Sequence, residues 1–308
     1  MKHGKRVKYA GGMKYDRGAA NVIANVCIIL FLTLYGLSIL FPFYNMLILS
    51  VASFDDAVRQ TFSLIPTSFT LDNYKQIFQD AQLIRAITIS TYNVLFGTSL
   101  ALVMTIFASY VLSRRSLPGR KALFYFVIFT MFFSAGLIPW YLTLVHYGFV
   151  NSFWVMTIPN ALSVFNMILM RNYFMSLPDS LEEAAKIDGA GEFTIMWRII
   201  VPLSKPILAT VALFYAVAFW NEWWTAMLLI QDRTLIPLAL LLRRLVIENV
   251  VAFGDAMGQA ARGTGQGPIH SRALEMATVT VATIPILIVY PFLQRYFTKG
   301  IMLGAIKA

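Results

Sequence analysis

The sequence predicts an all-α membrane protein with six transmembrane helices. Of its 308 residues, 58% are hydrophobic and only 13% are charged, whereas soluble domains carry about 25% charged residues. Apolar stretches recur at lengths near the roughly 20 residues that a helix needs to cross a bilayer. The excess of basic residues lies beside these stretches, where it orients a membrane protein. A nucleic-acid-binding protein would need a soluble basic face instead, so nucleic acid is not an expected partner.

The first expected span covers about residues 22–50, after a basic N-terminal tail at 1–21. This apolar run is much longer than the roughly 7–15 apolar residues of a cleavable signal peptide, so we expect an uncleaved membrane helix. The single cysteine, Cys27, lies in this span. An intrachain disulfide is therefore excluded, and the thiol is read as space-filling. The basic residues of the tail are Lys2, Lys5, Arg6, Lys8, Lys14 and Arg17.

Five further spans follow, and two of them come from one uncharged stretch. No Asp, Glu, Lys or Arg occurs between Leu123 and Met170. This stretch is too long for one crossing, so the turn-forming residues 147–152 divide it into a hairpin of two spans. Prolines within the spans are expected to kink them, because neighbouring helices can satisfy the freed backbone groups. The five spans are 86–112, 122–144, 153–171, 206–230 and 276–297, and the prolines are Pro139, Pro159, Pro285 and Pro291.

Basic residues also predict the orientation of the spans. Arg114, Arg115, Arg120 and Lys121 crowd one short connection, and such clusters mark cytoplasmic loops. Placing both termini in the cytoplasm puts most Lys and Arg residues on that side. The connection at 172–205 is then cytoplasmic as well, and 22–308 forms one transmembrane domain.

The 172–205 loop is polar and is expected to contain two short helices. Ser180 and Glu183 have the spacing of a capping box, which starts a helix by reciprocal side-chain bonds to backbone amides. Gly189 can adopt the left-handed turn that ends this helix. A second helix from about 192 to 200 should stop before Pro202, since proline disfavours the helical conformation in the preceding residue.

This loop has two readings, as an amphipathic connector on the lipid surface or as a docking element for a cytoplasmic protein. Ala184 and Ala185 are too small to anchor in lipid but suit close packing against another protein. The loop's acidic residues would also be repelled by anionic headgroups. Both points favour docking; the acidic residues are Glu182, Glu183, Asp188 and Glu192.

The pattern of the loop resembles the "EAA loop" of ABC-importer permeases: Glu-Ala-Ala, then Asp-Gly-Ala, then an aliphatic run closed by proline. Residues 158–174, 220–238 and 294–307 are similar to other parts of carbohydrate importers of the maltose type, especially permeases for oligosaccharides and polysaccharides. The resemblance implies a type I ABC-importer permease in which Glu183 pairs with a basic residue of an ATPase and Gly189 permits a sharp turn. The implied coupling residues are Glu183, Ala184, Ala185, Asp188, Gly189, Ala190 and Pro202.

The same resemblance implies the partners and the location. They are a second homologous permease, two cytoplasmic ATPase subunits, an extracellular solute-binding protein, membrane lipid and a carbohydrate substrate, at a bacterial plasma membrane. The chain has no Gly-x-x-x-x-Gly-Lys-Ser/Thr phosphate loop, and the Gly-rich run at 263–267 lacks the required lysine. ATP and Mg are therefore expected on the partner ATPase, and this chain is expected to be a non-catalytic subunit without a cofactor. His3, His146 and His270 lack metal-ligand spacing, so no metal site is expected.

Glu222 is the only acidic residue within an expected span, and such a residue is a functional candidate. It lies among Trp220, Asn221 and Trp223. Indole faces and hydrogen-bonding groups suit a passage for sugar. The alternative is an aromatic belt at the outer interface, with Glu222 reaching outer water.

Asn160, Ser163 and Asn166 recur at helical spacing in the fourth span and form one polar stripe. The stripe can line the translocation path or hydrogen-bond a neighbouring helix. The sequence leaves both possibilities open.

The long outer segment at 231–275 has two parts. Residues 235–251 are apolar with scattered charges, which favours an interfacial helix. The Gly-rich part beyond is either a spacer or, by resemblance to the maltose system, a loop that reaches the sugar cleft of the binding protein. The residues expected to make that contact are Arg262, Gly263, Gly265 and Gln266.

A secondary active transporter of a small polar solute is the alternative function. Such carriers carry more buried ionisable residues and repeated halves with paired broken helices. The sequence shows one acid at membrane depth and no internal repeat, so the importer subunit is favoured. The identity and length of the sugar stay open.

Overall fold

The computed structural model describes residues 19–53, 69–245, 247 and 273–288, and the regular elements in these ranges are helices. The basic tail, the Gly-rich outer loop and the end of the sixth expected span lie outside the described residues. The proposed contacts of Arg262, Gly263, Gly265 and Gln266 therefore lie outside them as well.

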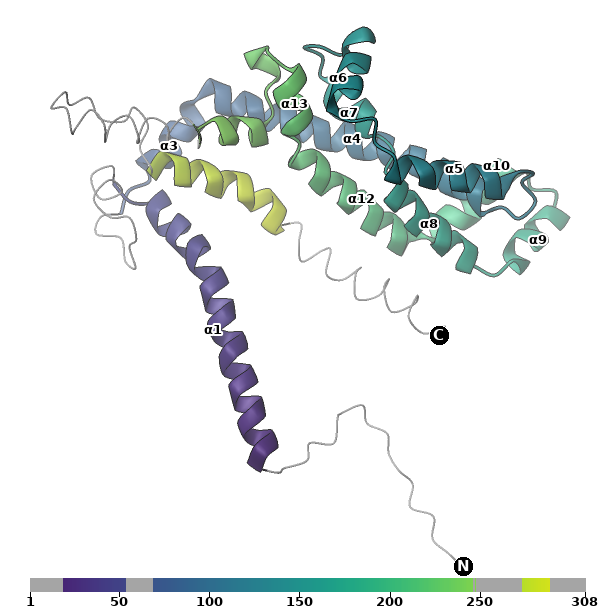
Figure 1. The fold of residues 1–308 in the computed structure, drawn as a ribbon, viewed down its shortest axis with the longest axis horizontal. Helices are drawn as coiled ribbons and strands as arrows, with labels where there is room; N and C mark the ends of the chain where they lie inside the picture. The colour runs from purple at the N-terminus through teal and green to yellow at the C-terminus, as the bar shows by residue number, and fades with distance from the viewer. Residues whose placement is uncertain (1–18, 54–68, 246, 248–272, 289–308) are drawn as a thin grey trace, which may run out of the picture.

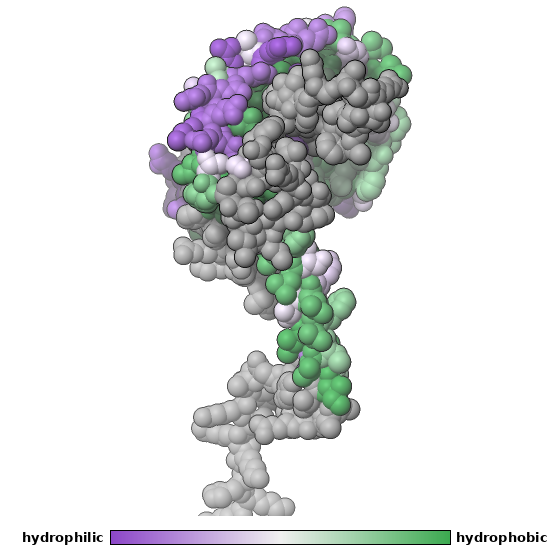
Figure 2. All heavy atoms as spheres, turned by 90° about the vertical axis from the view of Figure 1, so that its left-hand side faces the viewer, coloured by the Kyte–Doolittle hydropathy of each residue, from purple (hydrophilic) through white to green (hydrophobic). Residues whose placement is uncertain are grey.

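α1 spans Ala19–Ser50 and agrees with the first expected span to within three residues. It stands apart from the other helices over most of its length (Figure 1), and hydrophobic side chains cover it along that length (Figure 2). Its last turn contacts the following described residues. There the Asn73 side chain donates to the carbonyls of Ser50 and Ala52 at 3.1 and 2.9 Å. Asn73 belongs to α3, Asp72–Gln79.

α4, Ala81–Ser113, runs through the whole molecule from α3 to the 172–205 loop (Figure 1). It starts five residues before the expected span because Asp80 caps it, accepting hydrogen bonds from the Gln82 and Leu83 amides. α12, Lys205–Trp220, packs along α4. A Cβ at Gly97 of α4 would lie 2.9 Å from the Phe219 ring of α12, so glycine is what permits this close approach.

The span expected at 122–144 with a kink at Pro139 is not one continuous helix. α5, Arg120–Phe132, and α6, Leu137–His146, meet instead at 109°. Gly136 in the connection has a φ of 87°, which glycine tolerates best. Pro139 lies in the first turn of α6, where its missing N–H costs nothing. A continuous helix would place the Pro139 ring against the carbonyl four residues earlier, so the chain breaks before it.

The turn expected at 147–152 is confirmed. Gly148 and Asn151 both have positive φ, 75° and 53°. The Asn151 side chain also accepts hydrogen bonds from the amides of Gln231 and Asp232 at 2.6 and 3.0 Å. This turn is thereby tied to a segment eighty residues later in the chain.

The expected helix at 153–171 is also interrupted. It consists of α7, Trp154–Thr157, the 3₁₀ turn η1, Ile158–Asn160, a break at 161–163, and α8, Val164–Ser176. Pro159 lies in the 3₁₀ turn, where it cannot supply a helical hydrogen bond. The polar stripe therefore does not lie on one continuous helix.

The fifth span is a near-continuous pair of helices. α12 is followed by a break at 221–223 and by α13, Trp224–Leu229. Together they form a stretch long and apolar enough to cross a membrane. A 3₁₀ turn, η3, follows at Arg233–Leu235, and the described part of the last span is a helix at Ala273–Ile288.

By length and composition, three described helical stretches could each cross a membrane. They are Ile23–Ser50, Ala81–Ser113 and Lys205–Leu229, and the bent pair α5–α6 would be a fourth if it counts as one span. A polytopic membrane protein is therefore supported, while the number six stays a prediction.

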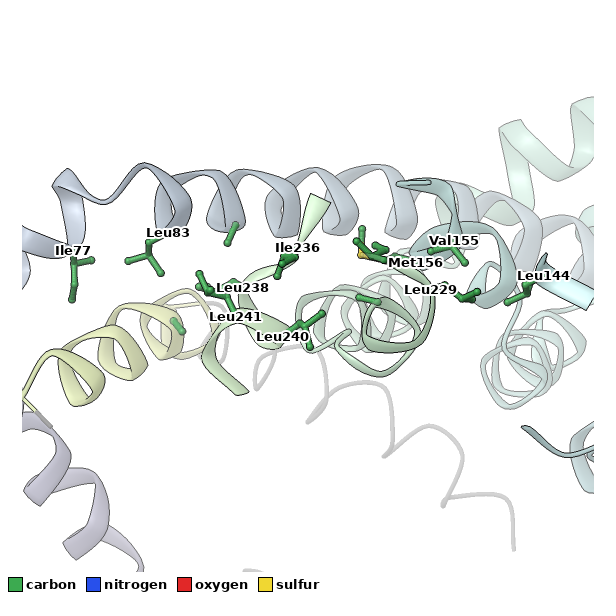
Figure 3. Close-up of a cluster of buried hydrophobic side chains, with 14 of the residues drawn as sticks. Ile77, Leu83, Leu144, Val155, Met156, Leu229, Ile236, Leu238, Leu240 and Leu241 are labelled. Atoms are coloured by element: carbon green, nitrogen blue, oxygen red, sulfur yellow. The ribbon is translucent and has the colours of Figure 1, made fainter. Parts of the chain in front are cut away.

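Two large hydrophobic clusters hold the described helices together, one toward each end of α4, and a small third cluster joins Leu49 of α1 to Ala273. The second cluster packs α4, α8 and α12 against the 172–205 loop. The first lies between α4 and the 238–245 helix (Figure 3). Leu238, Leu240 and Leu241 are buried in it, so the start of this segment is protein core and not the interfacial helix that its composition suggested. Labelled members of the first cluster are Ile77, Leu83, Leu144, Val155, Met156, Leu229, Ile236, Leu238, Leu240 and Leu241.

Buried polar side chains of α4 satisfy backbone groups that the helix breaks leave free. Asn93 donates to the Phe219 carbonyl at the end of α12 and accepts from the Thr157 hydroxyl, both at 3.0 Å. Ser90 accepts from the Leu238 amide at 2.8 Å. Non-helical backbone at membrane depth needs such partners, so the breaks are stable parts of the fold.

Candidate functional site

The first helix of the 172–205 loop, α9, spans Ser180–Ile187. Its N-cap is Asp179, and the expected capping box between Ser180 and Glu183 is wrong. The turn that follows Pro178 is already helical at Asp179, whose carbonyl accepts from the Glu183 amide at 3.1 Å. Ser180 therefore lies inside the helix and has no capping role.

Gly189 ends α9 as the sequence predicts, with a φ of 79°. The Gly189 amide donates to the Lys186 carbonyl at 3.0 Å, and the Ala190 amide to the Ala185 carbonyl at 2.9 Å. This pair of bonds is a Schellman motif, which satisfies carbonyls at the end of a helix. The turn reverses the chain within three residues.

The second helix of the loop continues through Pro202, contrary to expectation. α10, Glu192–Ile195, passes into a π-helical turn, Met196–Ile200, and then into α11, Val201–Leu203. A π turn is wider than an α turn. The wider turn increases the distance between the Pro202 ring and the carbonyl of the residue four positions earlier in the chain. The helix therefore continues past Pro202 and ends at Ser204.

Charged and polar contacts fasten the loop to the end of α4. Arg114 forms an ion pair with Glu182. The Tyr110 hydroxyl donates to Glu192 Oε2 at 2.6 Å, and Lys186 Nζ lies 2.8 Å from Glu192 Oε1. These two hydrogen bonds lower the pKa of Glu192 below its ordinary value.

The contribution of α4 to the loop was missed in the sequence. Arg114 and Arg115 were interpreted only as topological charges, and Tyr110 as part of an apolar span. Four acids in the loop opposite a cluster of arginines were the available signal. A cavity of about 330 Å³ lies between this end of α4 and α9.

The predicted coupling residues separate into an exposed face and a buried face. Glu183, Ala184, Asp188 and Gly189 are exposed, whereas Ala185 is buried against the second hydrophobic cluster. Ala190 is half-buried and Pro202 is exposed. The exposed face also carries the side chain of Ile187, which is 86% exposed. This exposed face therefore combines an apolar side chain with acidic ones.

A groove of about 430 Å³ lies between α8 and α12 and collects four of the seven predicted path residues. Asn160, Ser163 and Asn166 line one wall, and Glu222 lies on the other. The break before α8 brings the first three together even though they share no continuous helix. Sequence reasoning missed the other lining residues, which are Phe165, Phe214, Tyr215, Ala218 and Phe219.

The other three predicted path residues do not line the groove. The Trp220 indole donates to the Ala282 carbonyl at 3.3 Å, and the Trp223 ring lies under the Arg243 guanidinium at 3.9 Å. The Asn221 side chain donates to the Val217 carbonyl at 2.9 Å. These residues flank or lie in the break after α12. Because the backbone changes direction at this break, side chains that are neighbours in sequence point in different directions.

Glu222 both lines the groove and caps α13. Its Oε1 accepts from the Thr225 amide at 2.7 Å. A carboxylate at a helix N-terminus is stabilised by the free amides and the helix dipole. The capping of α13 is therefore sufficient to explain why an acidic side chain occurs within this expected span, and no contact with substrate is needed.

Tyr215 holds the break before α8 in place. Its hydroxyl oxygen accepts from the Ser163 amide at 2.9 Å and shares a 2.7 Å hydrogen bond with Thr105 of α4. Asn160 donates to the Met156 carbonyl at 3.3 Å. Asn166 is only 5% exposed, and its side chain has no hydrogen-bond partner among the described residues.

Among the described residues no group of three or more His, Cys, Asp or Glu side chains could hold a metal ion. Three carboxylates in and beside α9 and α10 pair with basic side chains: Glu182 with Arg114, Glu192 with Lys186, and Asp179 with Arg115 at 3.6 Å.

Comparisons with known proteins give one consistent answer. A family model described as "Binding-protein-dependent transport system inner membrane component" matches residues 100–303. The polygalacturonan/rhamnogalacturonan transport system permease protein YtcP of Bacillus subtilis (strain 168) is 40% identical over 277 residues, which cover 90% of this chain and 96% of that relative. Protein LplC of the same organism is 40% identical over 290 residues, covering 94% and 96%. The crystal structure of a bacterial ABC transporter for the acidic polysaccharide alginate contains a chain with a TM-score of 0.81 and 30% identity, covering 91% of this chain and 98% of that one.

Proposed function

The chain belongs to the family of binding-protein-dependent transport inner-membrane components, and from this premise we propose that it imports oligosaccharides or polysaccharide fragments as the transmembrane subunit of an ATP-driven transporter. Family membership makes it an ABC transporter permease and separates it from secondary carriers. The observation that carries the substrate class is the 40% identity, over nine-tenths of the chain, to a permease named for polygalacturonan and rhamnogalacturonan. The alginate importer supports the same class of substrate.

Coupling to the ATPase is proposed to run through α9 and the Gly189 turn. In this proposal Glu183 contacts a basic residue of the ATPase, while Ala184, Asp188 and Ile187 complete the docking face. Their exposure and the fixed turn beside them support this assignment. ATP and Mg are bound by the partner, and this chain contributes no catalytic residue.

We propose six spans with both termini in the cytoplasm, which adds the two spans of the hairpin at 122–171 and the partly described last span to the three clear candidates. α4 connects α3 at one end of the molecule with α9 at the other (Figure 1). This arrangement supports an outer end near α3 and a cytoplasmic end near α9. Hydrophilic side chains on the end that carries α3 are consistent with exposure to water there (Figure 2).

The translocation path is proposed to include the groove between α8 and α12, with its other wall supplied by a homologous permease. Amides, a hydroxyl and aromatic rings are the groups that proteins use to bind sugars, and the groove combines them. Its volume lies within the usual range of about 300–1,000 Å³ for ligand sites. At the outer end, the solute-binding protein delivers the sugar, and Arg262, Gly263, Gly265 and Gln266 are proposed to contact it.

The test is reconstitution of this chain with its homologous permease, two ATPase subunits and binding protein in proteoliposomes. We expect uptake of radiolabelled oligogalacturonide or neutral oligosaccharide that requires ATP and the binding protein. A complex with an inactive ATPase is the control. Uptake that continues without ATP and collapses with the ion gradient would contradict the proposal.

A further inference from the structure

The first turn of α8 faces the groove and presents hydrogen-bond donors to it. α8 begins at Val164, and Ser163, Phe165 and Asn166 line the groove. The first amides of a helix have no intrahelical acceptor, and the helix dipole places about half a positive elementary charge there. The Ser163 hydroxyl oxygen accepts from the Asn166 amide at 3.4 Å, so its own proton stays available for a ligand.

The side chain of Asn166 independently indicates a ligand. It is more than nine-tenths buried, lines the groove and has no hydrogen-bond partner in the described part of the chain. Buried amides in folded proteins nearly always have a partner. The groove is the space in which Asn166 can find one, beside the free amides of Val164 and Phe165.

One negatively charged side chain, Glu222, shares the groove with these donors. The first turn of α8 contains no acidic residue, and Glu222 is the charged side chain among the described residues of the groove. Its Oε1 accepts from the Thr225 amide of α13, so its charge is directed at another helix start.

A carboxylate fits this arrangement better than a hydroxyl. An ionised carboxylate only accepts hydrogen bonds, through two oxygens, and bonds to a charged acceptor are stronger than neutral ones. A sugar hydroxyl must also donate, and the α8 start offers mainly donors. Phe165 and Phe214 line the same groove and supply aromatic surface that suits the apolar face of a pyranose.

We propose that the start of α8, with Ser163 and Asn166, binds the carboxylate of a uronic acid residue in the passing oligosaccharide. This inference rests on the proposed function and specifies its substrate class. Selection for acidic sugars would then occur within the membrane and not solely in the binding protein.

The test measures equilibrium binding of trigalacturonate and of neutral galactotriose to the reconstituted permease–ATPase complex without binding protein. We expect tighter binding of trigalacturonate. Asn166→Asp removes a donor and adds a negative charge without changing the size of the side chain. It should weaken trigalacturonate binding about tenfold or more, as expected for a lost bond to a charged group, and galactotriose binding far less.

Asn172→Asp, at the exposed other end of α8, is the matched control and should leave both affinities unchanged. Equal affinities for the two sugars in the unmodified complex, or equal losses in Asn166→Asp, would overturn the uronate site. If ATP-driven uptake of galactotriose persists in that case, the proposed function stands. Absence of ATP-driven uptake of either sugar would contradict the proposed function itself.

Discussion

Gly189 links a backbone conformation directly to the proposed coupling role. Its φ is 79°, and a Cβ built there would meet no other atom within 4 Å. A larger residue at position 189 would therefore be destabilised by the backbone conformation and not by a steric clash. The left-handed conformation costs a non-glycine residue about 1–2 kcal/mol, and a β-branched residue is the least tolerant of it.

We expect Gly189→Val to reduce substrate-stimulated ATP hydrolysis of the complex several-fold, because about 1–2 kcal/mol shifts an equilibrium about 5- to 30-fold. The chain should still insert in the membrane. Gly191→Val is a matched control, since Gly191 has a φ of −73° and equally open surroundings. Equal stimulation in the two variants would show that the turn is not needed for coupling.

Glu183 is exposed on the docking face and forms no ion pair among the described residues. If it contacts a basic residue of the ATPase, Glu183→Lys should place like charges together and reduce co-purification of the ATPase. The matched control is the charge reversal Lys75→Glu on exposed α3, at the opposite end of α4. Full retention of the ATPase by Glu183→Lys would contradict the assigned contact.

Glu192 makes the attachment of the loop dependent on pH. Its pKa is lowered from 4.5 by hydrogen bonds from Lys186 and Tyr110. A lowered pKa stabilises the fold above the pKa of the unfolded state, and this stabilisation is lost as pH falls through the lower folded pKa. We expect the Tm of the wild type to fall more steeply on acidification below about pH 4.5 than that of Glu192→Gln. Parallel acid dependence of the two would contradict this contribution.

At the scale of elements, apolar content predicted where helices lie, but distant partners decide where they break. α1 and α4 were predicted to within a few residues because an uninterrupted apolar run has one stable form in lipid. The break after α12 depends on Asn93, which is 126 residues from the carbonyl that it satisfies. No local pattern encodes such a contact, so the interruption at 221–223 could not be predicted. Pro139 and Pro159 marked the other two interruptions, at 133–136 and 161–163, as kinks and not as full breaks.

The same distinction explains the mixed outcome at the site. Gly189 was predictable because a helix end is determined by local backbone chemistry. Asn160, Ser163, Asn166 and Glu222 were found because polar groups at membrane depth are costly and conspicuous. Trp220 and Trp223 do not line the same groove as Glu222, because the helix break at 221–223 separates side chains that are adjacent in sequence.

The contact between α4 and α12 can be tested at its closest point. A Cβ at Gly97 would lie 2.9 Å from the Phe219 ring, and overpacking of this kind costs about 1–3 kcal/mol. We expect Gly97→Ala to lower the Tm of the complex, and Phe219→Leu in the same chain to restore part of the loss. Gly36→Ala in α1 is the control, since Gly36 has open surroundings. Equal Tm changes in the two glycine variants would argue against close packing at Gly97.

At the scale of the whole molecule, two features indicate that this chain is one part of a larger assembly. Residues 23–44 of α1 include no buried side chain in the described structure. The groove between α8 and α12 is lined by exposed Asn160 and half-buried Glu222, which lie at breaks between apolar helices. Unsatisfied polar groups cost several kcal/mol each in hydrocarbon, so a water-filled path or a partner must face this groove.

The last prediction concerns that partner. ATP-driven uptake should require this chain, a homologous permease and ATPase subunits together, because the groove forms a closed path only between two permeases. Purification of the complex through a tag on this chain, followed by mass measurement, should give one copy each of the two permeases and two ATPase subunits. Omission of the homologous permease should abolish uptake and lower the Tm of this chain, because its polar groove then faces detergent or lipid. A tag-purified preparation that contains this chain as its sole permease and still imports sugar with ATP would contradict the assembly, and a Tm unchanged by the partner would show that the groove is stable uncovered.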